Sequence, residues 1–149
     1  MVRKHHRRHV QLIAPTVAVA AALACAAANA DVGISKPLTS QPGDAQRGKA
    51  VAVDSNRGNC TICHRLPIDA VPPSASGDLG PSLSGVGARF TAAQLRQRIV
   101  DARSLNPETL MPAYYVTQGL QRVQAKYAGQ PILRAQEVED LVAFLATLQ

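Results

Sequence analysis

Apolar residues recur along the chain at spacings of three and four, the period of a helix buried on one face. The most regular stripe, near the C-terminus, predicts a helix over 135–148. Its members are Val138, Leu141, Val142, Leu145 and Leu148. A second stripe of Leu95, Ile99 and Ala102 predicts a helix over 92–103. No segment reads as a strand, so the pattern predicts an all-α fold.

Polar residues mark where these helices begin. Thr91 and Gln94 form a capping box before the middle helix. Asp44 can cap an earlier helix over 45–53. Gly48 inside that helix should cost roughly 1 kcal/mol relative to Ala, a cost that a close approach of another element would offset.

The first thirty residues have the pattern of a secretory signal. Residues 1–9 are basic without an acid, an Ala-rich apolar run follows over 10–28, and small residues surround Ala30. A transmembrane anchor is the alternative, but Pro15 interrupts a weakly apolar run. Cys25 suggests a lipoprotein, although Ala22 does not match the usual leading Leu of that signal. We expect cleavage after Ala30.

Cleavage changes the composition of the chain. Removal of residues 1–30 takes four of the 16 Lys and Arg and none of the 10 acids, so the formal charge falls from +6 to +2. The high pI is therefore a feature of targeting and no argument for nucleic-acid binding. The remaining 119 residues suit one domain. We expect a flexible lead-in over 31–41 and one folded domain over 42–149.

The chemistry of the mature chain is concentrated in Cys60-Thr61-Ile62-Cys63-His64. C-x-x-C-H is the attachment signal of c-type haem. Each thiol adds to one vinyl group on the haem edge, and a tight helical turn places residues three apart on one side. His64, directly after Cys63, then supplies the proximal iron ligand. An exported protein also meets the attachment machinery in the right compartment.

Other uses of these residues fit the sequence less well. A structural disulfide between Cys60 and Cys63 is compatible with an oxidising compartment. A thioredoxin-like site would need a preceding strand, and residues 51–59 predict none. Zinc needs four ligands, and after cleavage no other Cys or His remains. We therefore predict one covalent haem c.

Two further residues complete the predicted site. Met111, the only methionine after cleavage, follows His64 by 47 residues and is expected to be the second axial ligand; the plainer interpretation is core filler. A proximal histidine commonly donates its other ring N–H to a backbone carbonyl. We assign that role to the region of Pro81, although an ordinary turn would have the same spacing.

These features together resemble the class I c-type cytochromes, in which helices and long loops enclose a single haem. The resemblance rests on an N-terminal helix, CTICH, GPSLSG at 80–85, a middle helix, the Met-Pro pair and a C-terminal helix. It implies that the first and last helices cross closely at Gly48 and Phe144. Residues 105–148, with MPAYY and AGQPIL, are similar to the monohaem cytochrome of the Sox thiosulfate-oxidising system, SoxX. Arg134 departs from the Thr cap common in that family, so we expect a weaker helix start.

The Sox resemblance implies a periplasmic heterodimer with a SoxA-type cytochrome, which joins thiosulfate oxidatively to a cysteine of the carrier SoxYZ. This chain would accept the released electrons and pass them to a small soluble cytochrome. A free electron shuttle is the alternative with the same haem site. A self-sufficient peroxidase would need an open iron site, which Met111 would close, and an acid–base residue such as a second histidine.

Overall fold

The computed structural model describes residues 33–149, and the predicted signal peptide lies outside this part of the chain. The described part is helical and contains no β-strand, which confirms the all-α prediction. Its α-helices are α2 (Ala45–Val53), α3 (Val86–Arg89), α4 (Ala92–Asp101) and α5 (Ala135–Ala146). Short 3₁₀ segments cover Cys60–Ile62, Pro73–Ala75, Ala102–Ser104 and Ala125–Tyr127. Within residues 33–149, no helix is both long and apolar enough to cross a membrane.

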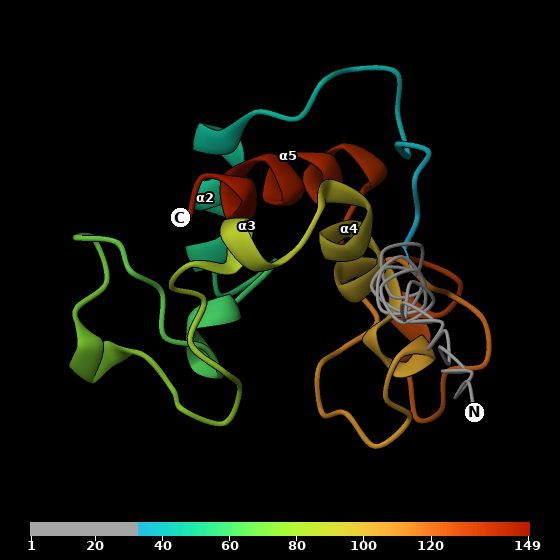
Figure 1. The fold of residues 1–149 in the computed structure, drawn as a ribbon. Coiled ribbons are helices and arrows are strands. Elements are labelled where there is room, and N and C mark those ends of the chain that lie inside the picture. The colour runs from blue at the N-terminus through green and yellow to red at the C-terminus, as the bar shows by residue number, and fades with distance from the viewer. Residues whose placement is uncertain (1–32) are drawn as a thin grey trace, which may run out of the picture. The chain divides into compact units, whose positions relative to one another are not determined.

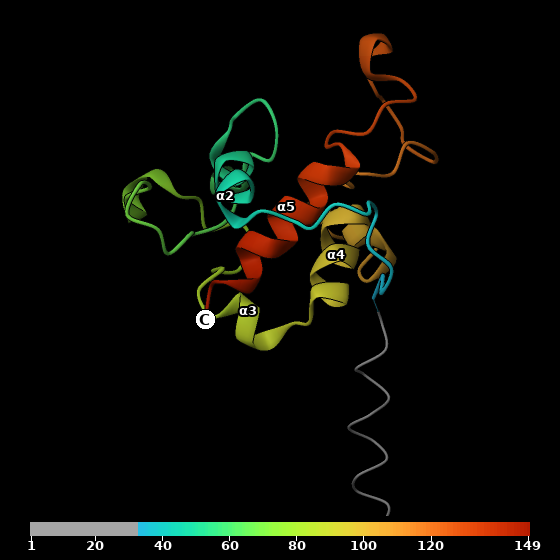
Figure 2. The same ribbon diagram turned by 90° about the horizontal axis from the view of Figure 1, so that it is seen from above.

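Helix α5 is the centre of the domain. It packs against α2, α3 and α4, and the two long connections over 54–85 and 102–134 extend from the same side of it (Figure 1). Seen from above, α2 and α4 lie on opposite sides of α5 (Figure 2). Buried side chains from all three helices form one core, including Val51, Leu95, Ile99, Val138, Leu141 and Phe144.

The crossing of α2 and α5 requires a glycine. A Cβ atom on Gly48 would overlap the backbone oxygen of Asp140 and would lie 2.8 Å from the Cβ of Phe144. Real carbon atoms in contact are about 3.5–4.0 Å apart. The close approach expected at Gly48 and Phe144 is therefore present, and the packing it allows offsets the cost of glycine inside a helix.

The ends of the helices follow from local hydrogen bonds. Asp44 caps α2 by accepting from the backbone N–H of Arg47 at 2.9 Å. The capping box of Thr91 and Gln94 is formed at α4. Helix α4 ends at Asp101, two residues earlier than predicted, because the backbone of Asp101 leaves helical geometry. Its side chain accepts a hydrogen bond from the backbone N–H of Arg103, and the chain continues as the 3₁₀ segment Ala102–Ser104.

Helix α5 starts with a different arrangement from a usual cap. Arg134 offers no acceptor, as expected from the sequence. Glu137 compensates, because its carboxylate accepts from the backbone N–H of Arg134 at 2.8 Å and from its guanidinium at 3.0 Å. Desolvation opposes ionisation of Glu137, but hydrogen bonds from Arg134 and Arg57 outweigh it and lower its pKa. A carboxylate in the first turn is also favourable to the helix dipole.

The segment predicted as a flexible lead-in over 31–41 is described from residue 33 onward, and this part hydrogen-bonds to two helices. This segment runs across α5 (Figure 2). The backbone N–H of Leu38 donates to Glu139 at 2.9 Å, and the carbonyl of Ile34 accepts from Arg96 at 2.6 Å. Arg96 and Glu139 also form a buried two-bond ion pair between α4 and α5, at 2.7 and 2.8 Å. The segment thus adds hydrogen bonds to both members of this ion pair.

Candidate functional site

The C-x-x-C-H sequence forms one tight turn. The chain enters it through Asn59, whose φ of 46° lies in the left-handed region. The segment Cys60–Ile62 is a 3₁₀ turn, and the backbone N–H groups of Cys63 and His64 donate to the carbonyl of Cys60 at 3.3 and 2.8 Å. Side chains three residues apart eclipse each other in such a turn. The two thiols therefore point to one side, with the imidazole directly after them.

No disulfide joins the two cysteines of this turn, so both sulfur atoms are available for covalent attachment. Cys60 packs against the hydrophobic core. Burial, with a smaller contribution from the neighbouring Cys63, raises the pKa of the Cys60 thiol to about 11. Before haem attachment Cys60 is therefore a neutral thiol at physiological pH, which argues against a role as a reactive thiolate nucleophile.

The imidazole of His64 is held in one orientation. Its Nδ1 lies 2.7 Å from the carbonyl oxygen of Pro81. Because a carbonyl can only accept, Nδ1 carries the proton and the lone pair of Nε2 is available to a metal. Gly80 leaves room for this ring, since a Cβ there would lie 2.6 Å from Nδ1 of His64 and 2.9 Å from Nε2. The structure thus brings together His64 and Pro81, which the sequence assigned to one another.

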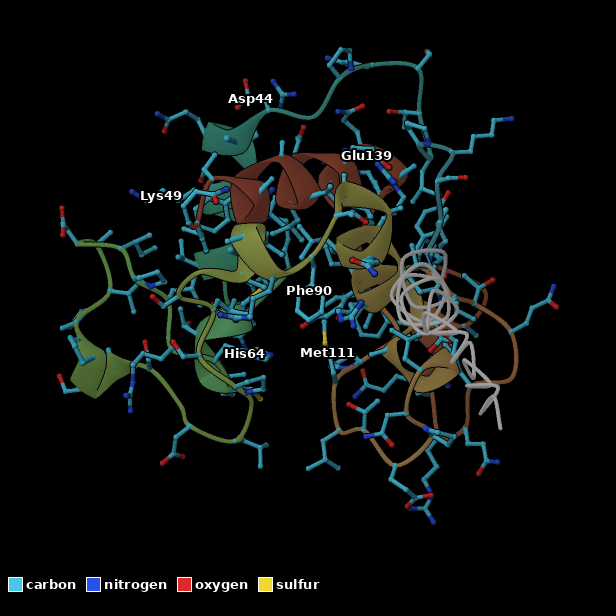
Figure 3. The ribbon with its side chains drawn as sticks, in the orientation of Figure 1. Asp44, Lys49, His64, Phe90, Met111 and Glu139 are labelled. Atoms are coloured by element: carbon cyan, nitrogen blue, oxygen red, sulfur yellow. The ribbon has the colours of Figure 1, made fainter. Side chains whose placement is uncertain are left out.

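Met111 lies in the other long connection. Its backbone N–H donates to the Thr109 hydroxyl at 3.2 Å, and its side chain is half-buried. Figure 3 shows His64 and Met111 on two separate segments, both below α5 in this view. The two candidate axial ligands thus come from different connections on the same side of the central helix.

Tyr114 joins these two connections, a feature that sequence analysis missed. Its hydroxyl donates to the carbonyl of Gly58 at 2.8 Å, two residues before Cys60. Burial raises the pKa of Tyr114 far above the usual value for tyrosine, and Cys60 and Cys63 raise it further. The side chain is partly buried and packs against the hydrophobic core.

The donor set fits haem c. Two free thiols on one turn can form thioethers with the two vinyl groups of the ring, and each S–H adds across one C=C bond. An imidazole and a thioether are a known axial pair for haem iron. Partly buried apolar side chains that pack on the core, among them Leu83 and Phe90, provide an apolar setting for a large ring.

Comparison with known proteins identifies the family. A model of the cytochrome c family matches residues 45–149. The chain belongs to the cytochrome c family. This cytochrome is also similar to the crystal structure of SoxXA from P. pantotrophus, with a TM-score of 0.69 and 37% sequence identity over 78% of this chain and 89% of that chain. No curated protein matches the chain.

Membership of the cytochrome c family confirms the predicted cofactor and fold class. The protein is an electron-transfer cytochrome with covalently bound haem c, enclosed by helices and long loops. The similarity to SoxXA agrees with the resemblance to the Sox monohaem cytochrome found in residues 105–148. The haem supplies a one-electron store. The chain's own part is to attach it, orient its ligands and surround it with apolar side chains.

Proposed function

We propose that Cys60 and Cys63 carry the haem thioethers, and that His64 and Met111 are the axial ligands of its iron. The turn that presents both thiols and the fixed imidazole supports the first three assignments. The position of Met111 on a separate connection, on the same side of α5, supports the fourth. The carbonyl of Pro81 would keep Nδ1 of His64 protonated and make the imidazole a stronger donor.

At the level of the molecule, the function is that of the electron-transfer subunit of a SoxAX-type L-cysteine S-thiosulfotransferase. The similarity to SoxXA carries this proposal. In it, the protein is exported to the periplasm by a signal peptide over 1–30 and forms a heterodimer with a SoxA-type cytochrome. It accepts electrons as thiosulfate is joined to a cysteine of SoxYZ and passes them to a small soluble cytochrome.

This subunit would have no sulfur chemistry of its own. After cleavage its only thiols are Cys60 and Cys63, and haem attachment consumes both. With His64 and Met111 as axial ligands, thiosulfate has no open position on the iron. Joining thiosulfate to a thiol releases two electrons, whereas one haem stores one. A second redox centre on the partner, or rapid re-oxidation of this haem, is therefore required.

A turnover assay tests the proposal. The mixture contains the mature chain, thiosulfate, the carrier with its cysteine and an electron acceptor, with or without the SoxA-type partner. We expect activity only when both cytochromes are present. The Cys63→Ser variant, which lacks one thioether, serves as the control for haem loading and should give reduced turnover in proportion to its haem content.

Two results would contradict the proposal. Full activity of this chain without a partner would reject the role of a subunit. A partner enzyme that turns over at the same rate without this chain, and a chain that remains monomeric beside it, would favour the alternative of a free electron shuttle in another respiratory or sulfur-oxidising chain.

A further inference from the structure

Tyr114 is fixed at three points that belong to different parts of the domain. Its backbone N–H donates to the carbonyl of Ile99 in α4 at 3.1 Å, and its carbonyl accepts from the N–H of Leu133 at 2.9 Å. Its hydroxyl donates to the carbonyl of Gly58 at 2.8 Å. The side chain therefore connects the segment that carries Met111 to the segment that carries the cysteines.

The acceptor of this hydrogen bond is itself held in place. Gly58 is buried, and its backbone N–H donates to the carbonyl of Val51 in α2 at 3.1 Å. A Cβ on Gly58 would lie 2.6 Å from that same oxygen, so glycine allows this approach. The carbonyl of Gly58 is thus a fixed point, and Tyr114 reaches it across 56 residues of sequence.

The chain between Tyr114 and Met111 is short and stiff. Only Pro112 and Ala113 separate the two residues, proline fixes one backbone angle, and Ala113 is buried with 6% exposure. A displacement of Tyr114 is therefore passed on to Met111 with little slack. Conversely, a large movement of the Met111 backbone would pull on Tyr114 and so on its hydrogen bond to Gly58.

We propose that Tyr114 is a positioning residue, whose hydrogen bond to Gly58 holds Met111 within reach of the haem iron and limits its replacement by other ligands. This proposal rests on the axial role of Met111. In this proposal the bond is present when Met111 is in place and is lost when Met111 leaves, and such a difference between two states is what shifts a population. If the Tyr114 hydroxyl is removed, the buried carbonyl of Gly58 receives no hydrogen bond from residue 114, whether Met111 is in place or displaced. The preference for the first state is then lost.

The size of the effect follows from the hydrogen bond that is lost. Removing the donor to this buried acceptor is compatible with a tenfold change in the equilibrium between protein with Met111 in place and protein with Met111 displaced. A tenfold change corresponds to 1.36 kcal/mol. A ligand that binds only after Met111 has left the iron meets only the fraction of protein in that open state. Its apparent association constant is therefore its intrinsic association constant multiplied by this fraction. The Tyr114→Phe variant should therefore bind such a ligand about tenfold more tightly.

The experiment is a titration of the oxidised, haem-loaded protein with imidazole, followed by the haem absorbance spectrum. Tyr114→Phe retains the ring and removes only the hydroxyl. Tyr115→Phe is the matched control, because the Tyr115 hydroxyl makes no hydrogen bond to residues 33–149 and only its backbone N–H donates, to Val100. We expect an apparent dissociation constant about tenfold lower for Tyr114→Phe and within twofold of wild type for Tyr115→Phe.

The same change in a Met111→Ala background separates positioning from a general structural role. Without Met111 there is nothing to displace, so adding Tyr114→Phe should leave imidazole affinity within about twofold. An unchanged affinity in Tyr114→Phe alone would overturn the proposal, as would the same tenfold change in the Met111→Ala background. If Met111→Ala itself binds imidazole no more tightly than wild type, the axial assignment of Met111 fails instead.

Discussion

The replacement of Gly48 by Ala adds one methyl group at the closest point between α2 and α5. A Cβ atom there would overlap the backbone oxygen of Asp140, which is already engaged in the hydrogen bonds of α5, and would lie 2.8 Å from the Cβ of Phe144. Neither neighbour is the end of a flexible side chain. The helices must therefore separate, and the buried contacts on both sides of the crossing loosen with them.

The expected loss of stability combines two opposing effects. Alanine favours the helix by about 1 kcal/mol over glycine. Overpacking a well-packed interior costs typically 1–3 kcal/mol and occasionally more. A contact of 2.8 Å to Phe144 is about 0.7 Å shorter than the ordinary lower limit of carbon contacts, and the overlap with Asp140 is more severe. We therefore expect a net destabilisation of about 2 kcal/mol.

Thermal unfolding of the haem-loaded protein measures this loss. For a domain of this size, 2 kcal/mol corresponds to a decrease of roughly 8 °C in Tm. The control is Ala50→Gly at an exposed position of the same helix, which should lower the free energy of unfolding by about 1 kcal/mol through propensity alone. A Gly48→Ala variant as stable as wild type, or more stable, would refute the reasoning about the crossing.

Three further predictions concern the site and the buried ion pair. Met111→Ala should lower the reduction potential by roughly 60 mV or more, a tenfold shift toward oxidised iron, measured by spectroelectrochemistry; an unchanged potential would require another ligand. Gly80→Ala should displace the ring of His64, weaken its donation and raise the potential by roughly 40 mV, from the loss of about 1 kcal/mol of hydrogen bonding; no shift would show that the ring is not confined. Arg96→Ala leaves Glu139 buried without its charged partner and should cost about 3–5 kcal/mol in denaturant unfolding at pH 7. Desolvation opposes ionisation of Glu139, but its hydrogen bonds from Arg96 outweigh this and lower its pKa. The contribution of the ionised Glu139 to the free energy of unfolding is therefore complete above the ordinary pKa of 4.5 and is lost as the pH falls below it. The difference in the free energy of unfolding between wild type and Arg96→Ala should therefore shrink in acid. A constant difference from pH 7 to 3 would show that it does not come from the ion pair with Glu139.

Features with a local cause could be predicted from the sequence. Helix α2 begins where Asp44 places it, because a cap acts on the N–H groups of the next turn. The approach at Gly48 could be inferred because a glycine inside a helix needs a packing reason. The pairing of His64 with Pro81 followed from the need of a ligating imidazole for a second hydrogen bond.

Features that depend on distant pairs could not be predicted. The pair of Arg96 and Glu139 joins residues 43 apart, and charged residues in helices are normally placed on the exposed face. Without this pair, nothing in the polar lead-in indicates that Leu38 has a fixed partner. The hydrogen bond of Tyr114 spans 56 residues. Helix α3 has only four residues, too few to show a helical period.

Isolation of the complex from the periplasm tests the central claim most directly. The full-length chain, tagged at its C-terminus, would be co-expressed with a SoxA-type cytochrome in a host that attaches c-type haem. The purified sample would then be measured by intact-mass spectrometry under denaturing conditions. We expect a stable 1:1 complex in which this chain begins after Ala30 and carries the mass of one covalent haem. A chain without covalent haem, or a haem-loaded chain that never retains the partner, would contradict the account.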